Sequence, residues 1–493
     1  MLELAEYQPK LPHFGHQAEE FLGHTRDSVR AILWEQGTGK TKEIIDQAAY
    51  LYEAGEIEVL LIVAPGGVHR NWVEDELPKH LPDRLVPDSM VLFYQSKAAN
   101  TQWHKHELLR AHRHKHGLVI VAMTYDQVMT QKGKEFLWKM LRDRKCFYVL
   151  DEHTDIKNPG SKRGKRVIAS GRYAPYKRIM DGTPVDEGPF DIYGPIRFLD
   201  PTFWKKHGLD DFGSFKTYFG LYVKGHNRAQ ERDFEQLVGY RRLGELNKML
   251  EDISTRVLKT DVLDLPPKLY SKRYHDMVPE QARVYKELKE YCLTVLESGG
   301  TVTATLPIVQ LLRLQQIVCG YVPTDEKDGE DGEPETLICD KNPRLDLARW
   351  YCDHVPHKCI IWARFRKDID LLCHMLGDRA VRYDGTLNDD QCAASKYEFQ
   401  NNEKVQFFVG NPQKGARGLT LVQARSMLYY SNSFRLRLRR QSEDRAHRAG
   451  QEHPVNYTDF VCPGTVDVRI HRSLRRKYDI AAKITGDELK EWI

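Results

Sequence analysis

The stretch from Ala31 to Thr41 constrains the fold more than any other part of the chain. It starts with four residues of strand character, passes through a glycine-rich turn to Lys40 and Thr41, and continues as a helical pattern over 42–51. Strand, glycine-rich turn and helix N-terminus together predict a phosphate-binding loop, in which backbone N–H groups surround phosphate oxygens. The strict pattern has glycine where this chain has Trp34. The shorter ending Gly-x-Gly-Lys-Thr is typical of helicase-type ATPases.

A set of nucleotide-binding residues follows from this loop. Lys40 is expected to reach the β- and γ-phosphates of ATP, and the Thr41 hydroxyl to ligate Mg²⁺. Upstream of a helicase-type loop, Gln17 occupies the position from which an amide can pair with an adenine edge. The expected set is Gln17, Gly37, Thr38, Gly39, Lys40 and Thr41.

Two acids supply the second half of the predicted ATPase site. The apolar segment 146–150 reads as a strand and delivers Asp151 and Glu152 at its carboxyl end. We expect Asp151 to hold Mg²⁺, and Glu152 to orient and deprotonate the attacking water. An acidic loop after a strand is the ordinary alternative, but the phosphate loop upstream favours the catalytic reading.

Apolar strands alternate with helical stretches on both sides of this site. An uninterrupted apolar run such as 59–64 is typical of a strand buried on both faces of a parallel sheet. The other expected strands are 91–94, 118–122, 147–150 and 178–180, and in the second half 359–362, 380–383, 405–409 and 426–430. This rhythm predicts α/β domains with ligands at the carboxyl ends of the strands.

The second α/β rhythm has no phosphate loop of its own. It includes Arg445 and Arg448, three residues apart and therefore expected on one helical face. Such a pair is either an ordinary solvated pair or a pair of arginine fingers for a nucleotide held by the first lobe. The missing phosphate loop favours the fingers. Four arginines just upstream are candidate phosphate contacts or part of a solvated basic face: Arg435, Arg437, Arg439 and Arg440.

Changes in composition along the chain indicate the domain boundaries. We expect a first lobe over 1–187, a helical protrusion over 188–262, a linker and helical region over 263–300, and a second lobe over 301–493. The acidic segment 324–336 lacks apolar residues and predicts a flexible loop.

Composition excludes several classes of protein. The 74 basic and 70 acidic residues leave a net charge of +4, too mild to identify a partner. No apolar run is long enough to span a membrane, and the N-terminus carries no secretory signal. Nine scattered cysteines indicate reduced thiols in an intracellular protein. Five histidines over 104–116 lack accompanying cysteines or acids, so a solvated basic helix is favoured over a metal site.

Taken in order, the motifs resemble the SNF2 (Swi2/Snf2-like) branch of superfamily 2 helicases. The resemblance runs from Leu11 to about Asp479. Its most specific part is Asp-Arg-Ala-His-Arg-Ala-Gly-Gln over 444–451, and the Asp-Glu pair is followed by the Ile-Lys-Asn extension of this branch. Two departures stand out, His-Thr after the two acids and Asp181 before Gly-Thr-Pro.

The resemblance implies two RecA-like parallel-sheet lobes that close on ATP and grip double-stranded DNA by its backbone, independently of sequence. On this basis Lys40, Asp151, Glu152, Arg445 and Arg448 are the expected catalytic residues. The matched motifs place DNA contacts at Pro65, Thr124, Tyr125, Lys157, Thr183, Asp384, Gly415 and Arg417.

The implied activity is ATP-driven movement along duplex DNA. A strand-separating helicase, a motor subunit of a restriction-type complex and an ATP-gated DNA-binding scaffold are the alternatives. A motor with few additions suggests recruiting protein partners and a bacterial or phage origin. The expected location is therefore the cytoplasm of a bacterium or phage-infected host, or the nucleus if the source is eukaryotic.

Overall fold

The computed structural model describes residues 3–96, 98, 100–227, 232–297, 305–322, 336–415, 419–488 and 492. The chain divides into two compact units. Unit 1 comprises Met1–Leu221, Tyr240–Asp264 and Ile480–Leu489, and unit 2 comprises Tyr222–Gly239, Leu265–Asp479 and Lys490–Ile493.

Unit 1 is built on a seven-stranded sheet in which every pairing is parallel. Its strands, in spatial order, are β3 (Met90–Phe93), β4 (Val119–Thr124), β2 (Val59–Ala64), β5 (Cys146–Asp151), β6 (Tyr176–Met180), β1 (Val29–Ile32) and β9 (Ser254–Thr255). The central strands β2, β4 and β5 are buried along their whole length, as their apolar runs predict. The expected parallel sheet is confirmed.

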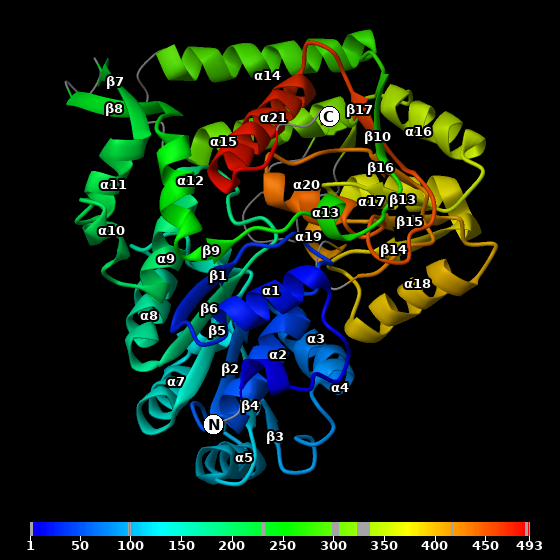
Figure 1. The fold of residues 1–493 in the computed structure, drawn as a ribbon. Helices are drawn as coiled ribbons and strands as arrows, with labels where there is room; N and C mark the ends of the chain where they lie inside the picture. Colours follow the sequence, from blue (N-terminus) through cyan, green and yellow to red (C-terminus); the bar gives the residue numbers. More distant parts are fainter. Residues whose placement is uncertain are drawn as a thin grey trace. The chain divides into compact units, whose positions relative to one another are not determined.

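Helices cover both faces of this sheet (Figure 1). On one side lie α2 (Lys40–Glu53), α3 (Val68–Asn71), the π-helical turn η2 (Trp72–Glu76) and α4 (Leu77–His80). On the other lie α7 (Gln131–Asp143), α8 (Lys162–Ser170) and α9 (Tyr193–Leu199). The remaining elements up to residue 192 are η1 (Leu4–Glu6), α1 (Gly15–His24), α5 (Gln102–Arg113), α6 (Tyr125–Met129), η3 (His153–Ile156), η4 (Gly171–Tyr173) and η5 (Pro189–Ile192).

The segment 188–262 was expected to be a helical protrusion, and it contains strands as well as helices. Besides α9 it contains α10 (Phe203–Lys206), α11 (Phe212–Phe219), α12 (Leu243–Glu251) and α13 (Lys259–Val262). It also contains β7 (Gly220–Asn227) and β8 (Arg232–Tyr240), which form a two-stranded sheet. The expected helical protrusion does not include these two strands. The aromatic and β-branched residues of these segments favour strands once a partner strand is available.

Unit 2 contains a six-stranded parallel sheet. Its strands, in spatial order, are β10 (Lys268–Tyr274), β17 (Val455–Val461), β16 (Ser426–Tyr429), β13 (Cys359–Trp362), β15 (Phe407–Gly410) and β14 (Ala380–Tyr383). The edge strand β10 lies in the region expected to be a linker. Most of its side chains are exposed, so it lacks the apolar run that predicted β13, β14, β15 and β16. The strand β17 was not expected either.

The other elements of the second half are mainly helices. They are α14 (Pro279–Glu297), α15 (Thr305–Val318), α16 (Pro343–His354), α17 (Arg366–Leu376), η6 (Gly377–Arg379), α18 (Asp389–Asn401), α19 (Pro412–Gly415), α20 (Leu436–Glu443) and α21 (Val466–Thr485). The short strands β11 (Tyr321–Val322) and β12 (Thr336–Leu337) pair antiparallel. Of the predicted acidic loop, 324–335 lie outside the described residues. None of the helices described is both long and apolar enough to cross a membrane.

A buried ion-pair network joins α20 to β17 in unit 2. The guanidinium of Arg439 donates to Asp459 (3.0 Å) and to Glu443 (2.8 Å), and all three side chains are buried. Arg439 is therefore neither a phosphate contact nor part of a solvated face, and that expectation is wrong for this residue. Its charge is compensated inside the unit.

Removing one partner of this network should destabilise unit 2 strongly. We expect Asp459→Ala to cost about 3–5 kcal/mol, because it leaves the Arg439 guanidinium buried without its main counter-charge. The exposed pair Arg379–Asp353 provides the control, and Asp353→Ala should cost less than about 1 kcal/mol. Calorimetric unfolding of the full-length variants measures both. Equal effects of the two substitutions would contradict the prediction.

Candidate active site

The phosphate-loop segment joins β1 to α2 in unit 1. Gly37 and Gly39 have φ angles of 85° and 87°, a left-handed conformation that favours glycine. A Cβ atom at Gly39 would also lie 2.3 Å from Nε2 of Gln17. Both the backbone conformation and the close approach of Gln17 therefore require glycine at position 39.

Lys40, the first residue of α2, reaches back over the loop. Its Nζ donates to the carbonyl oxygens of Trp34 (2.8 Å) and Glu35 (2.9 Å), and the residue is 9% exposed. The Thr38 hydroxyl donates to the same Glu35 carbonyl (2.7 Å). Thr41 follows in the first turn and is half-buried. The Lys40 ammonium and the Thr41 hydroxyl thus lie at the N-terminus of α2, where the helix dipole is positive. This is a favourable environment for phosphate.

Gln17 braces this loop from α1. Its Nε2 donates to the Gly39 carbonyl (3.0 Å), and its Oε1 accepts from the backbone N–H of Phe14 (3.0 Å). The neighbouring His16 ring is hydrogen-bonded to the Thr38 carbonyl (2.8 Å). The side chain of Gln17 is fully buried. Its amide is held against the loop backbone, so pairing with adenine stays a prediction.

Asp151 ends β5 and is held from two sides. The indole Nε1 of Trp72, in η2, donates to its Oδ2 (2.9 Å), and the hydroxyl of Tyr125 donates to its backbone carbonyl (3.0 Å). Tyr125 is only 1% exposed. We expected Tyr125 to contact DNA, but its ring lies in the core, so the side chain supports Asp151 instead. The preceding residue, Thr124, caps α6, and its hydroxyl accepts a hydrogen bond from the Gln127 backbone N–H.

Glu152 has a backbone conformation that is unusual for its residue type. Its φ of 55° and ψ of 53° lie in the left-handed region, which costs free energy for residues other than glycine. Strained backbone of this kind occurs most often at functional sites. Its N–H donates to the Met180 carbonyl on β6 (2.9 Å). Its Oε1 accepts from Nε2 of Gln36 in the phosphate loop (3.3 Å). The two halves of the predicted ATPase site are therefore in contact.

A third carboxyl lies in this site. Asp181 directly follows β6, the strand between β5 and β1, and its Oδ1 accepts from the backbone N–H of Thr183 (2.7 Å). Burial raises the pKa of Asp181 to about 8, and the charge of Asp151 adds to this, while the Thr183 N–H and Lys40 oppose it. Asp181 is not among the expected site residues, although an acid directly after an apolar strand is the same signal that predicts Asp151.

The turn after Asp181 packs directly against the phosphate loop. A Cβ atom at Gly182 would lie 2.8 Å from Cγ of Gln36, so the turn and the loop are in close contact. His153, which follows the two acids, is fully buried in η3, and burial lowers its pKa to about 3. His153 is therefore neutral and adds no charge to the site.

The remaining expected DNA contacts of unit 1 sit around the carboxyl edge of the sheet. Pro65 directly follows β2 and is buried, and Thr183 is 4% exposed. The ammonium of Lys157 lies 3.7 Å from carboxylate oxygens of both Asp186 and Asp191. Of these three, Lys157 is the most accessible to a phosphate.

The two predicted arginine fingers lie in turns of unit 2, just after α20. We expected one helical face, but α20 ends at Glu443. Both side chains nevertheless meet one loop: Arg445 donates to the Leu419 carbonyl (3.0 Å), and Arg448 to the Thr420 hydroxyl (2.9 Å). Burial lowers the pKa of Arg445 to about 10. Arg448 also donates to the Leu419 carbonyl (3.3 Å), so the same backbone carbonyl accepts from both guanidinium groups.

The other expected contacts of unit 2 have structural partners. Asp384 is buried, accepts from the Thr386 backbone N–H (3.0 Å) and forms an ion pair with Arg382. A Cβ atom at Gly415 would lie 2.5 Å from the Trp362 ring. Arg417 lies outside the described residues.

Comparisons with known proteins agree with this arrangement. Residues 24–321 match the model of the SNF2-related domain, and residues 344–450 match the helicase conserved C-terminal domain. The ISWI chromatin-remodeling complex ATPase CHR17 of Arabidopsis thaliana is 25% identical over 468 residues, covering 91% of this chain and 40% of the relative. The putative ATP-dependent helicase/translocase YwqA of Bacillus subtilis is 23% identical, covering 93% and 46%.

A solved structure also resembles the chain. The Sulfolobus solfataricus SWI2/SNF2 ATPase core in complex with dsDNA aligns with 99% of this chain and 96% of its own at 22% identity, with a TM-score of 0.40. The chain spans less than half the length of the two curated relatives described above. The first family match covers more than half of the sequence and contains the phosphate loop, both acids and Asp181. The chain therefore belongs to the SNF2-related family.

Proposed function

We propose that this chain is an ATP-hydrolysing motor that moves along double-stranded DNA. One observation supports the hydrolytic part above all others: the hydrogen bond between Gln36 of the phosphate loop and Glu152. Because of this contact, the proposed base lies next to the loop that is proposed to receive the phosphates. Family membership supports the coupling to DNA.

The roles of the site residues follow from their chemistry. Lys40 neutralises charge on the β- and γ-phosphates, and its two carbonyl partners already direct it across the loop. Glu152 accepts a proton from the attacking water. Arg445 and Arg448 are proposed to neutralise the charge of the transition state, exchanging their contacts with backbone carbonyls for contacts with phosphate.

The residues present fit a magnesium ion that accompanies ATP. Thr41 offers a hydroxyl and Asp151 a carboxylate, and oxygen ligands of this kind are the ones that Mg²⁺ prefers. The Trp72 indole fixes the orientation of the Asp151 carboxylate (2.9 Å). When bound, Mg²⁺ neutralises charge on the phosphate oxygens.

The DNA contact is proposed to be independent of sequence. Thr124, Thr183 and Lys157 offer hydroxyl and ammonium groups, which suit phosphate oxygens rather than base edges. Pro65, Asp384, Gly415 and Arg417 complete the proposed set. For Asp384 and Gly415 the proposal concerns the backbone, because the Asp384 carboxylate is paired and glycine has no side chain.

Recruiting protein partners and an intracellular location belong to the same proposal. The eight cysteines whose side chains are described are all free thiols, which suits a reducing compartment.

The proposal is tested first by steady-state ATP hydrolysis without nucleic acid, with single-stranded DNA and with duplex DNA. Duplex DNA should stimulate turnover most, and the stimulation should fade as salt rises, because phosphate contacts release counterions. Assays at two salt concentrations measure both effects. Stimulation by single strands alone would indicate a strand-separating helicase. A response that is the same with and without DNA would contradict the DNA part of the proposal.

Lys40→Ala should lower ATP hydrolysis by at least about 100-fold, because the charge on the transferred phosphoryl group loses its cation. The fold should persist, since the hydrogen bonds of the Lys40 ammonium go to carbonyls of the loop at the edge of the sheet. Turnover assays and circular dichroism measure the two effects. Lys79→Ala, an exposed lysine on α4, serves as control and should leave turnover unchanged.

Glu152→Gln should stop hydrolysis while ATP binding is retained. The amide keeps an oxygen that accepts from Gln36 but cannot take the proton from water, so turnover should fall by about 100-fold or more. ATP-bound protein should then stay on duplex DNA, as measured by retention on an immobilised duplex. Lys40→Ala should not show this retention. Wild-type turnover in Glu152→Gln would disprove the assignment of the base.

A further inference from the structure

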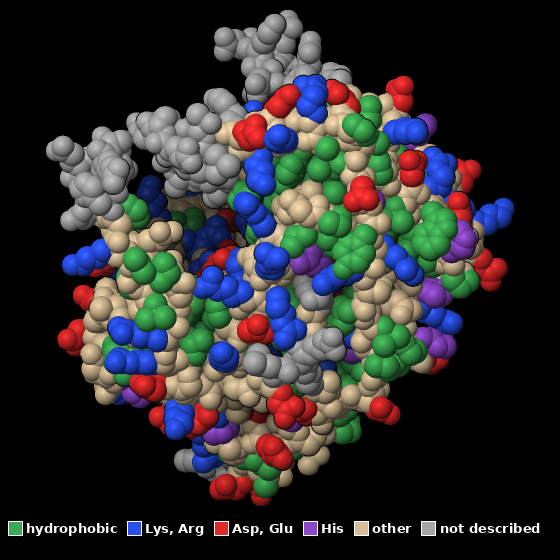
Figure 2. All heavy atoms as spheres, turned by 90° about the horizontal axis from the view of Figure 1, so that it is seen from above, with side chains coloured by type: hydrophobic (Ala, Val, Ile, Leu, Met, Phe, Trp, Pro, Cys, Tyr) green, Lys and Arg blue, Asp and Glu red, His purple; other side chains and the backbone are tan. Residues whose placement is uncertain are grey.

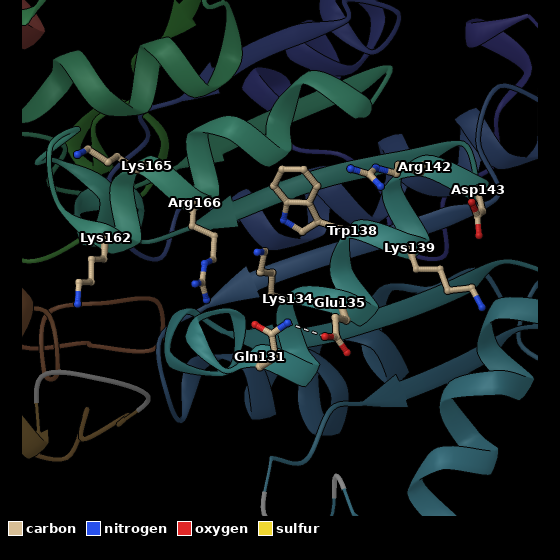
Figure 3. A pocket seen from close by; sticks show the side chains of 10 residues that line it. All are labelled: Gln131, Lys134, Glu135, Trp138, Lys139, Arg142, Asp143, Lys162, Lys165 and Arg166. Carbon is tan, nitrogen blue, oxygen red and sulfur yellow. Dashed lines mark hydrogen bonds between the residues drawn. The ribbon is translucent and has the colours of Figure 1, made fainter.

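Arg256, directly after β9, has surroundings that differ from those of the cations at the surface. On the face of the molecule drawn in Figure 2, Lys and Arg side chains are interspersed with acids and reach solvent. In the groove between α7 and α8, Lys139, Lys162 and Lys165 are likewise exposed (Figure 3). The side chain of Arg256 is 15% exposed, and its guanidinium donates to the segment that leads into the phosphate loop. Arg256 is not among the expected site residues.

Residues 33–35 join β1 to the phosphate loop and are paired with residues 255–257. The first and the last N–H group of 33–35 donate to carbonyls of 255–257, both at 2.9 Å. The parallel pairing of β1 with β9 thus continues up to the loop. This segment matters for the ATP site, because the carbonyls of Trp34 and Glu35 accept from the Lys40 ammonium.

Arg256 and Lys259 hold the same segment through further contacts. Nη1 of Arg256 donates to the Leu33 carbonyl (2.5 Å). Nη2 of Arg256 lies 4.0 Å from Oε1 of Glu35, whose Oε2 accepts from the backbone N–H of Lys259 (2.9 Å). One short stretch of chain therefore fixes both the backbone and the Glu35 side chain of this segment. The positions of the carbonyls that contact Lys40 depend on it.

The guanidinium of Arg256 is oriented by an acid from the C-terminal part of the chain. Its Nε donates to Oδ1 of Asp487 (2.9 Å), and its Nη2 donates to Oδ2 (2.7 Å). The Asp487 side chain is 11% exposed. A bidentate pair fixes the plane of the guanidinium as well as its position, so Nη1 is directed at the Leu33 carbonyl. All of these residues belong to unit 1.

The end of α21 determines where Asp487 lies. The helix ends immediately before Gly486, whose φ of 76° is the left-handed conformation that commonly follows a helix C-terminus. The backbone N–H of Asp487 then donates to the Ala482 carbonyl (2.9 Å). The Asn247 amide, on α12, donates to the Ile484 carbonyl (3.0 Å). The last turn of α21 is thus anchored to α12, and Asp487 is held beside Arg256.

We propose that Arg256, held by Asp487, is a positioning residue for ATP: it fixes the carbonyls that direct Lys40 toward the phosphates. This inference rests on the proposed function. The carboxylate of Asp487 neutralises the guanidinium, so the pair supplies position rather than charge. Arg256 therefore acts through residues 33–35 and not as a cation of the reaction. ATP binding consequently depends on the segment that follows α21.

The test makes Asp487→Asn and Arg256→Gln, separately and together, in the full chain. Each single substitution should weaken ATP binding by about 10-fold, because a charge-assisted hydrogen bond that orders the loop is lost. The ATP KM should rise while kcat at saturating ATP changes much less, as expected when binding rather than chemistry is affected. The double variant should bind ATP as Arg256→Gln does, because Asp487 acts through Arg256. Titration with a fluorescent ATP analogue and steady-state turnover measure these effects.

Arg84 provides a matched control within unit 1. It forms a bidentate pair with Glu53 (2.6 and 2.9 Å), and its Nη1 donates to the Gln8 carbonyl (2.7 Å). Glu53 is the last residue of α2, whereas Lys40 is the first. Glu53→Gln breaks an equivalent pair away from the phosphate loop, so it should leave the affinity for ATP unchanged. An equal loss of affinity in Glu53→Gln and Asp487→Asn would indicate a general structural effect and overturn the inference.

Two further results would contradict the role of Arg256. One is unchanged ATP affinity in both single variants. The other is additive losses in the double variant, because Asp487 would then act independently of Arg256. The proposed function fails in a different way. A wild-type chain that binds the ATP analogue but does not hydrolyse ATP would refute the proposed hydrolysis, whereas the affinity measurements would still decide the role of Arg256. A wild-type chain that does not bind the analogue would refute both.

Discussion

The site depends on the parallel pairing of β6 with both of its neighbours. Met180 lies opposite Ile32 on β1 and opposite Asp151 on β5. Because all three strands run in the same direction, the loops that follow them leave the same edge of the sheet. The phosphate loop, the two acids and Asp181 therefore meet, although about 150 residues of sequence separate the first from the last.

Hydrogen bonds across this edge connect groups with different roles. Gln36 joins the phosphate loop to Glu152, and Gln17 joins the same loop to α1. Trp72 and Tyr125 hold the side chain and the backbone of Asp151. Each contact fixes a group to which the proposed mechanism gives a role at the phosphates, and electrostatic catalysis requires such groups to be in place before charge develops. The left-handed backbone at Glu152 persists because this surrounding structure determines it.

The basic residues of the chain divide into two kinds. Some have buried structural partners. Arg439 is buried against Asp459 and Glu443, and Arg445 donates to backbone carbonyl groups. Others, such as Lys139 and Lys162, are exposed and form no ion pair with another described residue. The sequence alone does not distinguish the two kinds, because arginines that are buried against a sheet and arginines that face solvent can form the same local sequence pattern. Burial and partners distinguish them, and these depend on the tertiary structure.

The sequence by itself determined both parallel sheets, most strands to within about two residues, the phosphate loop and the two acids. Buried parallel strands need continuous apolar runs, and phosphate binding needs glycines beside a lysine. Only the tertiary structure decided the remainder. It made β10 a strand, placed Tyr125 inside the core and buried Asp181 within electrostatic reach of Lys40 and Asp151. These outcomes depend on neighbours that are distant in sequence, and the local pattern of apolar and polar residues does not identify such neighbours.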